Sequence, residues 1–174
     1  MAKVSFTKLG LKVNQEIKTI EFNEQTIEVK QYLPLNDKLE LIGNIINLSA
    51  DDNNFANPIK IKVFTILEII YAYTNINFTD KQKEDGNKLY DLLVSSGLVN
   101  SIFELIPAEE QEMISKSVVE SVEAIYKYRN SVLGILDSVT TDYSDLNLEA
   151  NEIYKTIADP NNLTLLKDVI TKLG

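Results

Sequence analysis

The chain has 174 residues, of which 44% are apolar and 25% charged, the proportions of a folded globular domain. It contains no cysteine, histidine or tryptophan. Those absences exclude disulfides, thiolate metal sites, thiol nucleophiles and Ser–His–Asp triads. The formal net charge of −9 argues against nucleic acid as a partner, because a phosphate backbone requires a basic surface.

The first elements are predicted to be β-strands. Residues 16–22 and 25–30 alternate apolar and polar side chains, and Asn23-Glu24 between them has the length of a tight hairpin turn. An earlier strand over residues 4–9 is expected to join them. We therefore predict an N-terminal β-ribbon over residues 1–33, followed by one compact helical domain over residues 34–174.

The spacing of apolar residues changes to that of helices after Pro34. Asn36 is the expected N-cap of the first helix. Its inner side is expected to carry Leu39, Leu41, Ile42, Ile45, Ile46 and Leu48. A polar loop over residues 51–54 leads to Asn57-Pro58, a strong helix start. The second helix, over residues 59–73, is apolar on nearly all sides, which predicts central burial.

A capping box marks the start of the third helix. Thr79 is its expected N-cap with Gln82 three positions later, and the helix is predicted to run to about Ser96, where Gly97 stops it. Its inward residues are expected to be Leu89, Leu92 and Leu93. A short helix over residues 98–106 follows.

Pro107 begins the longest predicted helix, which continues to Val139 without an internal proline. Glu109, Glu110 and Glu112 lie in its first turns, where the helix dipole favours acidic groups. Two further helices are predicted over residues 148–158 and 162–173. The predicted fold is therefore mainly α, a bundle of about five to six helices preceded by a small β-hairpin.

The long helix carries the candidate binding surface. An apolar seam follows steps of three and four residues, with an arginine inside it: Val118, Val122, Ile125, Arg129, Val132, Leu136 and Val139. One interpretation is a face of the protein's own core; the other is an exposed interface that binds a partner or a second copy. The candidate partner-binding residues are Tyr126, Tyr128, Arg129, Val132, Leu133 and Leu136.

No motif predicts catalysis or a bound cofactor. Asp142, Asp145, Asn147 and Glu149 could coordinate calcium, but their spacing is not that of an EF-hand, and a helix N-cap loop is the favoured interpretation. There is no glycine-rich phosphate loop. The helical tyrosines, Tyr71, Tyr73, Tyr90, Tyr126 and Tyr128, are expected at the edge of the core with their hydroxyls reaching water. We predict no catalytic, cofactor or metal site. An enzyme that uses two carboxylates from distant parts of the sequence stays an alternative.

Several short segments resemble proteins encoded in the structural gene clusters of tailed phages. They are Thr7-Lys8-Leu9-Gly10-Leu11-Lys12, residues 27–34 with the helix over 38–48, Tyr73-Thr74-Asn75-Ile76, Phe78-Thr79 and Tyr128-Arg129-Asn130-Ser131. The chain is most similar to tail assembly chaperones, which have a short N-terminal β element before an acidic helical domain. The resemblance implies a protein that binds tape measure and tail tube proteins.

Two alternatives stay open at this point: an inhibitor of a host defence protein, and a minor virion, neck or connector protein. The first 11 residues lack the apolar core of a signal peptide, and the apolar stretch over residues 63–73 is about half the length of a membrane span. We therefore expect no membrane association and a location in the bacterial host cytoplasm or in the virion.

Overall fold

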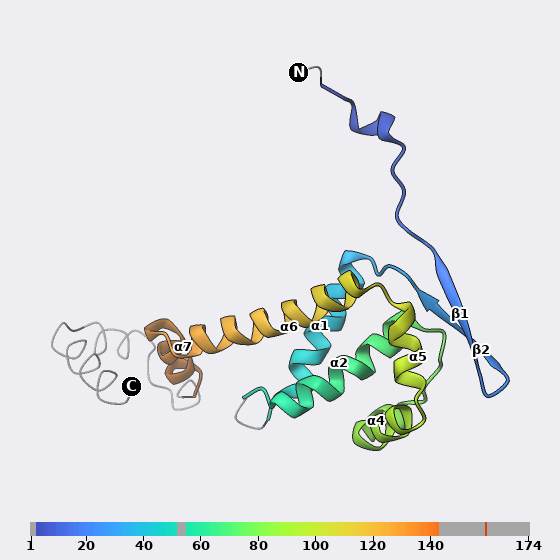
Figure 1. Cartoon of the computed structure of the whole chain (residues 1–174). Coiled ribbons are helices and arrows are strands. Elements are labelled where there is room, and N and C mark those ends of the chain that lie inside the picture. Colours follow the sequence, from blue (N-terminus) through green and yellow to red (C-terminus); the bar gives the residue numbers. More distant parts are fainter. Residues whose placement is uncertain (1–2, 52–54, 143–158, 160–174) are drawn as a thin grey trace. The chain divides into compact units, whose positions relative to one another are not determined.

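The computed structural model describes residues 3–51, 55–142 and 159 (Figure 1). The fold is mainly helical with an antiparallel hairpin near the N-terminus, as predicted. The elements are η1 (Phe6–Leu9), β1 (Ile17–Phe22), β2 (Gln25–Lys30), α1 (Leu35–Ser49), α2 (Pro58–Tyr73), α3 (Asp80–Glu84), α4 (Gly86–Ser95), α5 (Leu98–Leu105), α6 (Ala108–Arg129) and α7 (Val132–Asp142).

The chain divides into two compact units, Met1–Val122 and Glu123–Gly174, so the division lies inside α6. The division predicted from the sequence, a β-ribbon over residues 1–33 and a helical domain over residues 34–174, stays a prediction. The hairpin belongs to the first unit because Ile27, Val29 and Leu33 are part of the same buried cluster as the helices. The predicted helices over 148–158 and 162–173 lie outside the described residues.

The hairpin forms as predicted, with Phe22 paired with Gln25 and Ile20 with Ile27. Asn23 and Glu24 both have positive φ, 48° and 64°, as a two-residue type I′ turn requires. The predicted strand over residues 4–9 is wrong. Residues Phe6–Leu9 form a 3-10 turn, which Gly10 ends with a φ of 60°.

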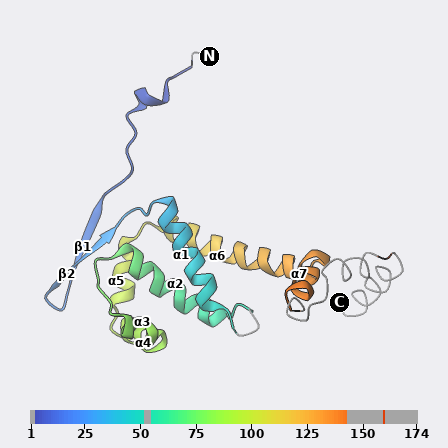
Figure 2. The ribbon, with the colours of Figure 1, turned by 180° about the vertical axis from the view of Figure 1, so that it is seen from behind.

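The outer edge of β2 is attached to the segment after α2. The Asn75 amide donates to the carbonyl of Glu28 at 3.3 Å, and the Glu28 amide donates to Asn75 Oδ1 at 3.0 Å. Lys30 Nζ adds a bond to the Ala72 carbonyl at 3.0 Å. These bonds hold the hairpin beside the end of α2, as both ribbon views show (Figures 1 and 2).

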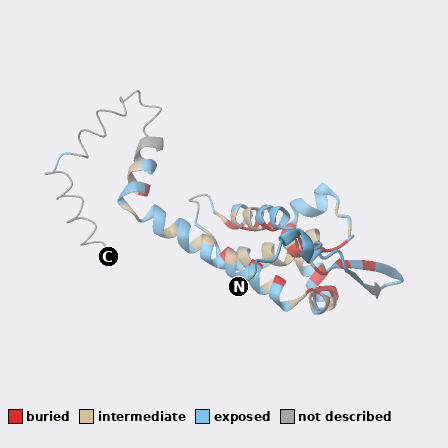
Figure 3. Ribbon diagram, turned by 90° about the horizontal axis from the view of Figure 1, so that it is seen from above, coloured by how far each residue is buried: buried red, intermediate tan, exposed pale blue. Residues whose placement is uncertain are grey.

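The core of the first unit is built around α2. Its buried side chains are Leu67, Ile69, Ile70 and Tyr73, which confirms the predicted central burial of this helix. Asn57 is its N-cap as predicted, accepting from the amides of Ile59 and Lys60. Other core side chains come from α1, α4, α5 and α6: Leu41, Ile45, Leu89, Leu93, Ile102, Ile114 and Val118. Buried positions accordingly gather where the helices meet (Figure 3).

Helix α1 begins two residues earlier than predicted. Pro34 occupies the N-cap position and Asn36 lies inside the helix. Of the six residues predicted to face inward, Leu39 and Leu48 are exposed. The buried stripe of α1 is Lys38, Leu41, Ile45 and Ser49, which is narrower than its apolar composition implies.

The third predicted helix is two helices. The capping box of Thr79 and Gln82 forms as predicted at the start of α3. The chain then breaks at Asp85, whose side chain caps α4 through the Lys88 amide. Gly86 begins α4 so close to α2 that an added Cβ would lie 3.3 Å from the Phe64 ring. Leu92, which was predicted to face inward, is exposed on α4. Gly97 follows the end of α4 with a φ of 80°.

Candidate functional site

The candidate binding residues lie on both sides of a sharp corner between α6 and α7. The long helix was predicted to reach Val139, but α6 ends at Arg129. Ser131 makes the corner: its amide donates to the Tyr128 carbonyl at 2.9 Å, and its hydroxyl accepts from the Gly134 amide at 3.1 Å, capping α7. A Cβ on Gly134 would lie 2.2 Å from the Tyr128 carbonyl oxygen, so the corner requires glycine there.

A side-chain contact closes the corner. The Tyr128 hydroxyl, from the last turn of α6, donates to the carboxylate of Asp137 on α7. The predicted seam therefore does not follow one straight helix. Val118 is fully buried in the first unit, whereas Val132 and Leu136 belong to a second helix with its own axis. Val139 has no described side chain.

The corner brings all six candidate residues into one short region of the second unit. Tyr126, Tyr128 and Arg129 are on the last turn of α6, and Val132, Leu133 and Leu136 are on the first turns of α7. Tyr126 and Leu136 are half-buried, and Arg129 is exposed. The exposed fractions are 68% for Leu133, 50% for Tyr128 and 44% for Val132. We name these six residues the corner patch.

A second cluster, which the sequence did not predict, lies inside the first unit around Glu110. Its Oε1 lies 2.6 Å from Lys38 Nζ, and its Oε2 accepts from the Tyr73 hydroxyl at 2.7 Å and the Leu33 amide at 3.2 Å. Lys38 also lies 4.3 Å from the centre of the Tyr32 ring. From the sequence, Glu110 was expected only to interact favourably with the helix dipole. The prediction that the Tyr73 hydroxyl reaches water is wrong, because Tyr73 is fully buried.

The electrostatics of this cluster favour an ionised Glu110. Burial acts to raise the pKa of Glu110, but the hydrogen bonds from Lys38, Tyr73 and Leu33 lower it by more, so the pKa lies below its ordinary value. The pKa of Tyr73 is raised, first by burial and then by its bond to Glu110. The cluster is therefore a satisfied ion pair that joins α1, α2 and α6.

A hollow of about 490 Å³ lies between α1 and α2. Glu68 is its central polar group, and Asn44 donates to Glu68 Oε2 at 3.2 Å. Burial raises the pKa of Glu68; the bond from Asn44 and the nearby Lys83 oppose this shift, and Glu40 adds to it. The carboxylates of Asp37 and Glu40 line the same hollow. Three lysine and amide groups from the same walls face them: Lys30, Lys83 and Asn44.

The described residues include no group of three or more acidic side chains placed to hold a metal ion. The acidic residues from Asp142 to Glu149, interpreted above as a helix N-cap loop, lie outside the described side chains. In the described part of the chain, no helix has both the length and the apolar character of a membrane span.

The fold defines the class of the protein as a mainly helical domain with an N-terminal β-hairpin. No protein family, curated protein or solved structure matches the chain.

Proposed function

We propose that the protein is a non-enzymatic protein-binding protein that acts in tail or virion assembly of a tailed bacteriophage, as a chaperone or a minor structural component. The observation that carries the proposal is the corner patch. Leu133 and Val132 expose 68% and 44% of their surface on a helix beside Tyr128 and Arg129. Tyrosine and arginine are enriched in binding hot spots, and the exposed aliphatic side chains beside them add apolar surface to bury.

The charge of the chain supports a partner with a basic rim. Residues 101–174 hold thirteen acidic and six basic side chains, a formal charge of −7. Such a surface repels nucleic acid and anionic lipid and attracts basic protein surfaces. The resemblance to tail assembly chaperones makes the tape measure and tail tube proteins the first partners to test, in the bacterial cytoplasm.

The buried charged groups also support binding rather than catalysis. Glu110 and Lys38, the most deeply buried ion pair in the described residues, make their contacts with each other and with Tyr73, Tyr32 and Leu33. Each of these contacts joins two parts of the fold. The burial of this ion pair is therefore explained by its role in joining parts of the fold.

The experiment is a quantitative pull-down of the full chain with the tape measure and tail tube proteins of the same gene cluster. Leu133→Asp is expected to weaken binding about 30-fold, the effect of removing a hot spot. Leu92→Asp is the matched control, because Leu92 is a leucine of similar exposure, 60%, on α4 of the first unit. Absence of binding to either protein, with both soluble alone, would overturn the proposal, and so would equal losses in the two variants.

A further inference from the structure

Helix α2 carries a single acidic residue, Glu68, on an otherwise strongly apolar sequence. Glu68 is half-buried, and the bond that its Oε2 accepts from Asn44 at 3.2 Å is its only hydrogen bond within the described residues. The ion pairs of the described residues lie elsewhere: Lys38–Glu110, Lys116–Glu120 and Lys127–Glu123. The carboxylate has therefore lost part of its hydration without gaining an ion pair in return.

This carboxylate lies in the hollow of about 490 Å³ between α1 and α2, next to an apolar lining. The apolar lining residues are Leu33, Leu41, Leu48, Phe64, Tyr71 and Ala72. A volume of this size, with an apolar lining and a few polar groups, is typical of small-molecule sites. A single lysine or arginine side chain of a protein partner would fill only a part of it, which favours a free small molecule.

The aromatic side chains of the hollow are held in place by packing. Tyr71 contacts Phe78 with the ring centres 5.0 Å apart, and Lys83 Nζ lies 5.1 Å from the centre of the Tyr71 ring. Phe64 is packed against the start of α4, where a Cβ added to Gly86 would lie 3.3 Å from its ring. Because these side chains are already ordered, a ligand would bind with little further loss of conformational entropy.

The charged groups of the hollow favour an organic cation. Three carboxylates and two ammonium groups line it, a net charge of −1: Asp37, Glu40, Glu68, Lys30 and Lys83. Both ammonium groups have a partner in the fold, since Lys30 donates to the Ala72 carbonyl and Lys83 lies over the Tyr71 ring. The described residues hold no group of three acidic side chains placed for a metal ion. The lining therefore suits a positive group carried on an apolar body.

We propose that the hollow between α1 and α2 binds a small organic cation, an ammonium or guanidinium group on an aliphatic or aromatic body. The positive group donates to the Glu68 carboxylate, whose Oε1 accepts no bond within the described residues. The apolar body lies against Leu41 and Phe64. This site belongs to the first unit and the corner patch to the second, so the inference does not depend on the proposed function.

The first test uses phenethylamine as the probe, because it joins an ammonium group to an aromatic body. Titration into the isotope-labelled full chain at neutral pH is expected to shift the backbone amide resonances around Asn44, Glu68 and Tyr71. Phenylethanol and phenylacetate keep the ring but carry a neutral and a negative group, and should bind about tenfold more weakly or less. Equal binding of the three compounds, or resonance shifts confined to other regions, would overturn the proposal.

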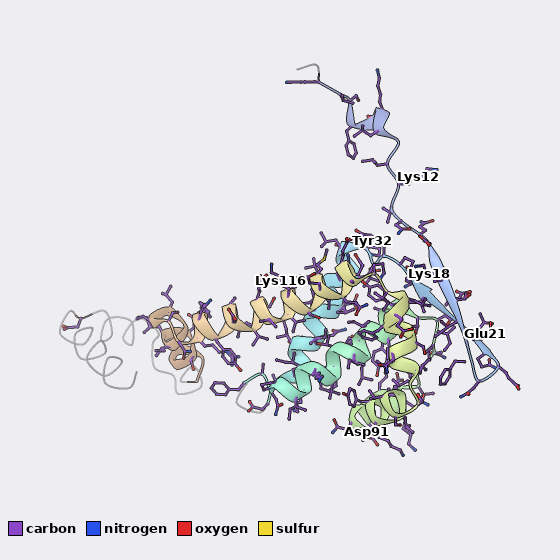
Figure 4. The ribbon with its side chains drawn as sticks, in the orientation of Figure 1. Lys12, Lys18, Glu21, Tyr32, Asp91 and Lys116 are labelled. Carbon is purple, nitrogen blue, oxygen red and sulfur yellow. The ribbon has the colours of Figure 1, made fainter. Side chains whose placement is uncertain are left out.

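The second test changes the carboxylate alone. Glu68→Gln keeps an oxygen to which Asn44 can donate, but removes the charge, and should weaken phenethylamine binding about 10- to 100-fold. Its free energy of unfolding should be unchanged or higher, because the half-buried carboxylate has no ion pair to lose. The matched control is Asp91→Asn, at an exposed carboxylate on α4 outside the hollow (Figure 4), which should leave binding unchanged.

The two variants leave the proposal with clear failing outcomes. Equal affinity of Glu68→Gln and the natural chain would overturn it, as would equal losses in Glu68→Gln and Asp91→Asn. A large loss of stability in Glu68→Gln would show that the carboxylate serves the fold instead of a ligand, and would overturn it as well.

Discussion

Replacing Glu110 by glutamine is expected to destabilise the first unit strongly. Glutamine has nearly the same shape and can still accept hydrogen bonds from the Tyr73 hydroxyl and the Leu33 amide. It cannot supply the negative charge that faces Lys38 Nζ at 2.6 Å. Lys38 is only 3% exposed, so its ammonium group would be left buried without a counter-charge.

The expected magnitude follows from that burial. Removing one partner of a buried ion pair typically costs about 3–5 kcal/mol, because the remaining charge loses both its partner and its hydration. The stacking of Lys38 on Tyr32, at 4.3 Å from the ring centre, offsets a small part of this cost. We therefore expect Glu110→Gln to lower the free energy of unfolding by about 3 kcal/mol.

The assay is urea unfolding followed by far-UV circular dichroism, since the chain has no tryptophan for fluorescence. Lys38→Met and the double variant, Lys38→Met with Glu110→Gln, complete a double-mutant cycle. The double variant removes both charges and keeps the acceptor for Tyr73, so it should be more stable than either single variant. A loss below about 1 kcal/mol in Glu110→Gln, or strictly additive losses, would refute the buried-pair interpretation.

The pH dependence gives an independent check. The folded-state pKa of Glu110 lies below its ordinary value of 4.5. The stability from this group is therefore present above the unfolded pKa and is lost as the pH falls through the folded pKa. Between about pH 6 and pH 3 the natural chain should lose more stability than Glu110→Gln. Parallel pH profiles for the two proteins would contradict the cause assigned to the pKa shift.

Three further outcomes are expected. Arg129→Ala should change the free energy of unfolding by less than about 0.5 kcal/mol in a urea titration, because Arg129 is exposed and its substitution leaves no buried charge. A loss of several kcal/mol would contradict its exposed position. Gly134→Ala should disrupt the corner, since the added Cβ would lie 2.2 Å from the Tyr128 carbonyl oxygen. Hydrogen exchange of the amides around Ser131 should become faster in this variant. Gly43→Ala, which adds a Cβ in open space, is the control and should leave the exchange rates unchanged. Asn57→Ala should cost about 1 kcal/mol in thermal unfolding through loss of the α2 cap, and an unchanged midpoint would contradict that role.

Features encoded by close neighbours in the sequence were predictable. The caps at Asn57 and Thr79 bond to amides two or three residues away. The Asn23-Glu24 turn and the Gly97 stop are likewise local, so their residue types alone indicate the structure. The central position of α2 followed from its composition, because an all-round apolar helix has no side that can face water.

The Glu110 cluster could not be predicted, because its bonds span 37 to 77 residues of sequence. Glu110 has the same local signal as Glu109: an acidic residue in the first turn of a helix. Only the packing of α1 and α2 against that turn makes Glu110 different. Lys38 lies in the buried stripe of α1. A single sequence does not distinguish such a buried lysine from an exposed one.

The corner between α6 and α7 was not predicted for a different reason. The seam from Val118 to Leu136 fits a continuous helix, and no proline interrupts it. Ser131 competes with the helix by bonding to the Tyr128 carbonyl and then capping α7. Gly134, three residues later, is the residue whose missing side chain permits the approach of Tyr128. A serine followed by glycine three positions on was the local cue for the corner.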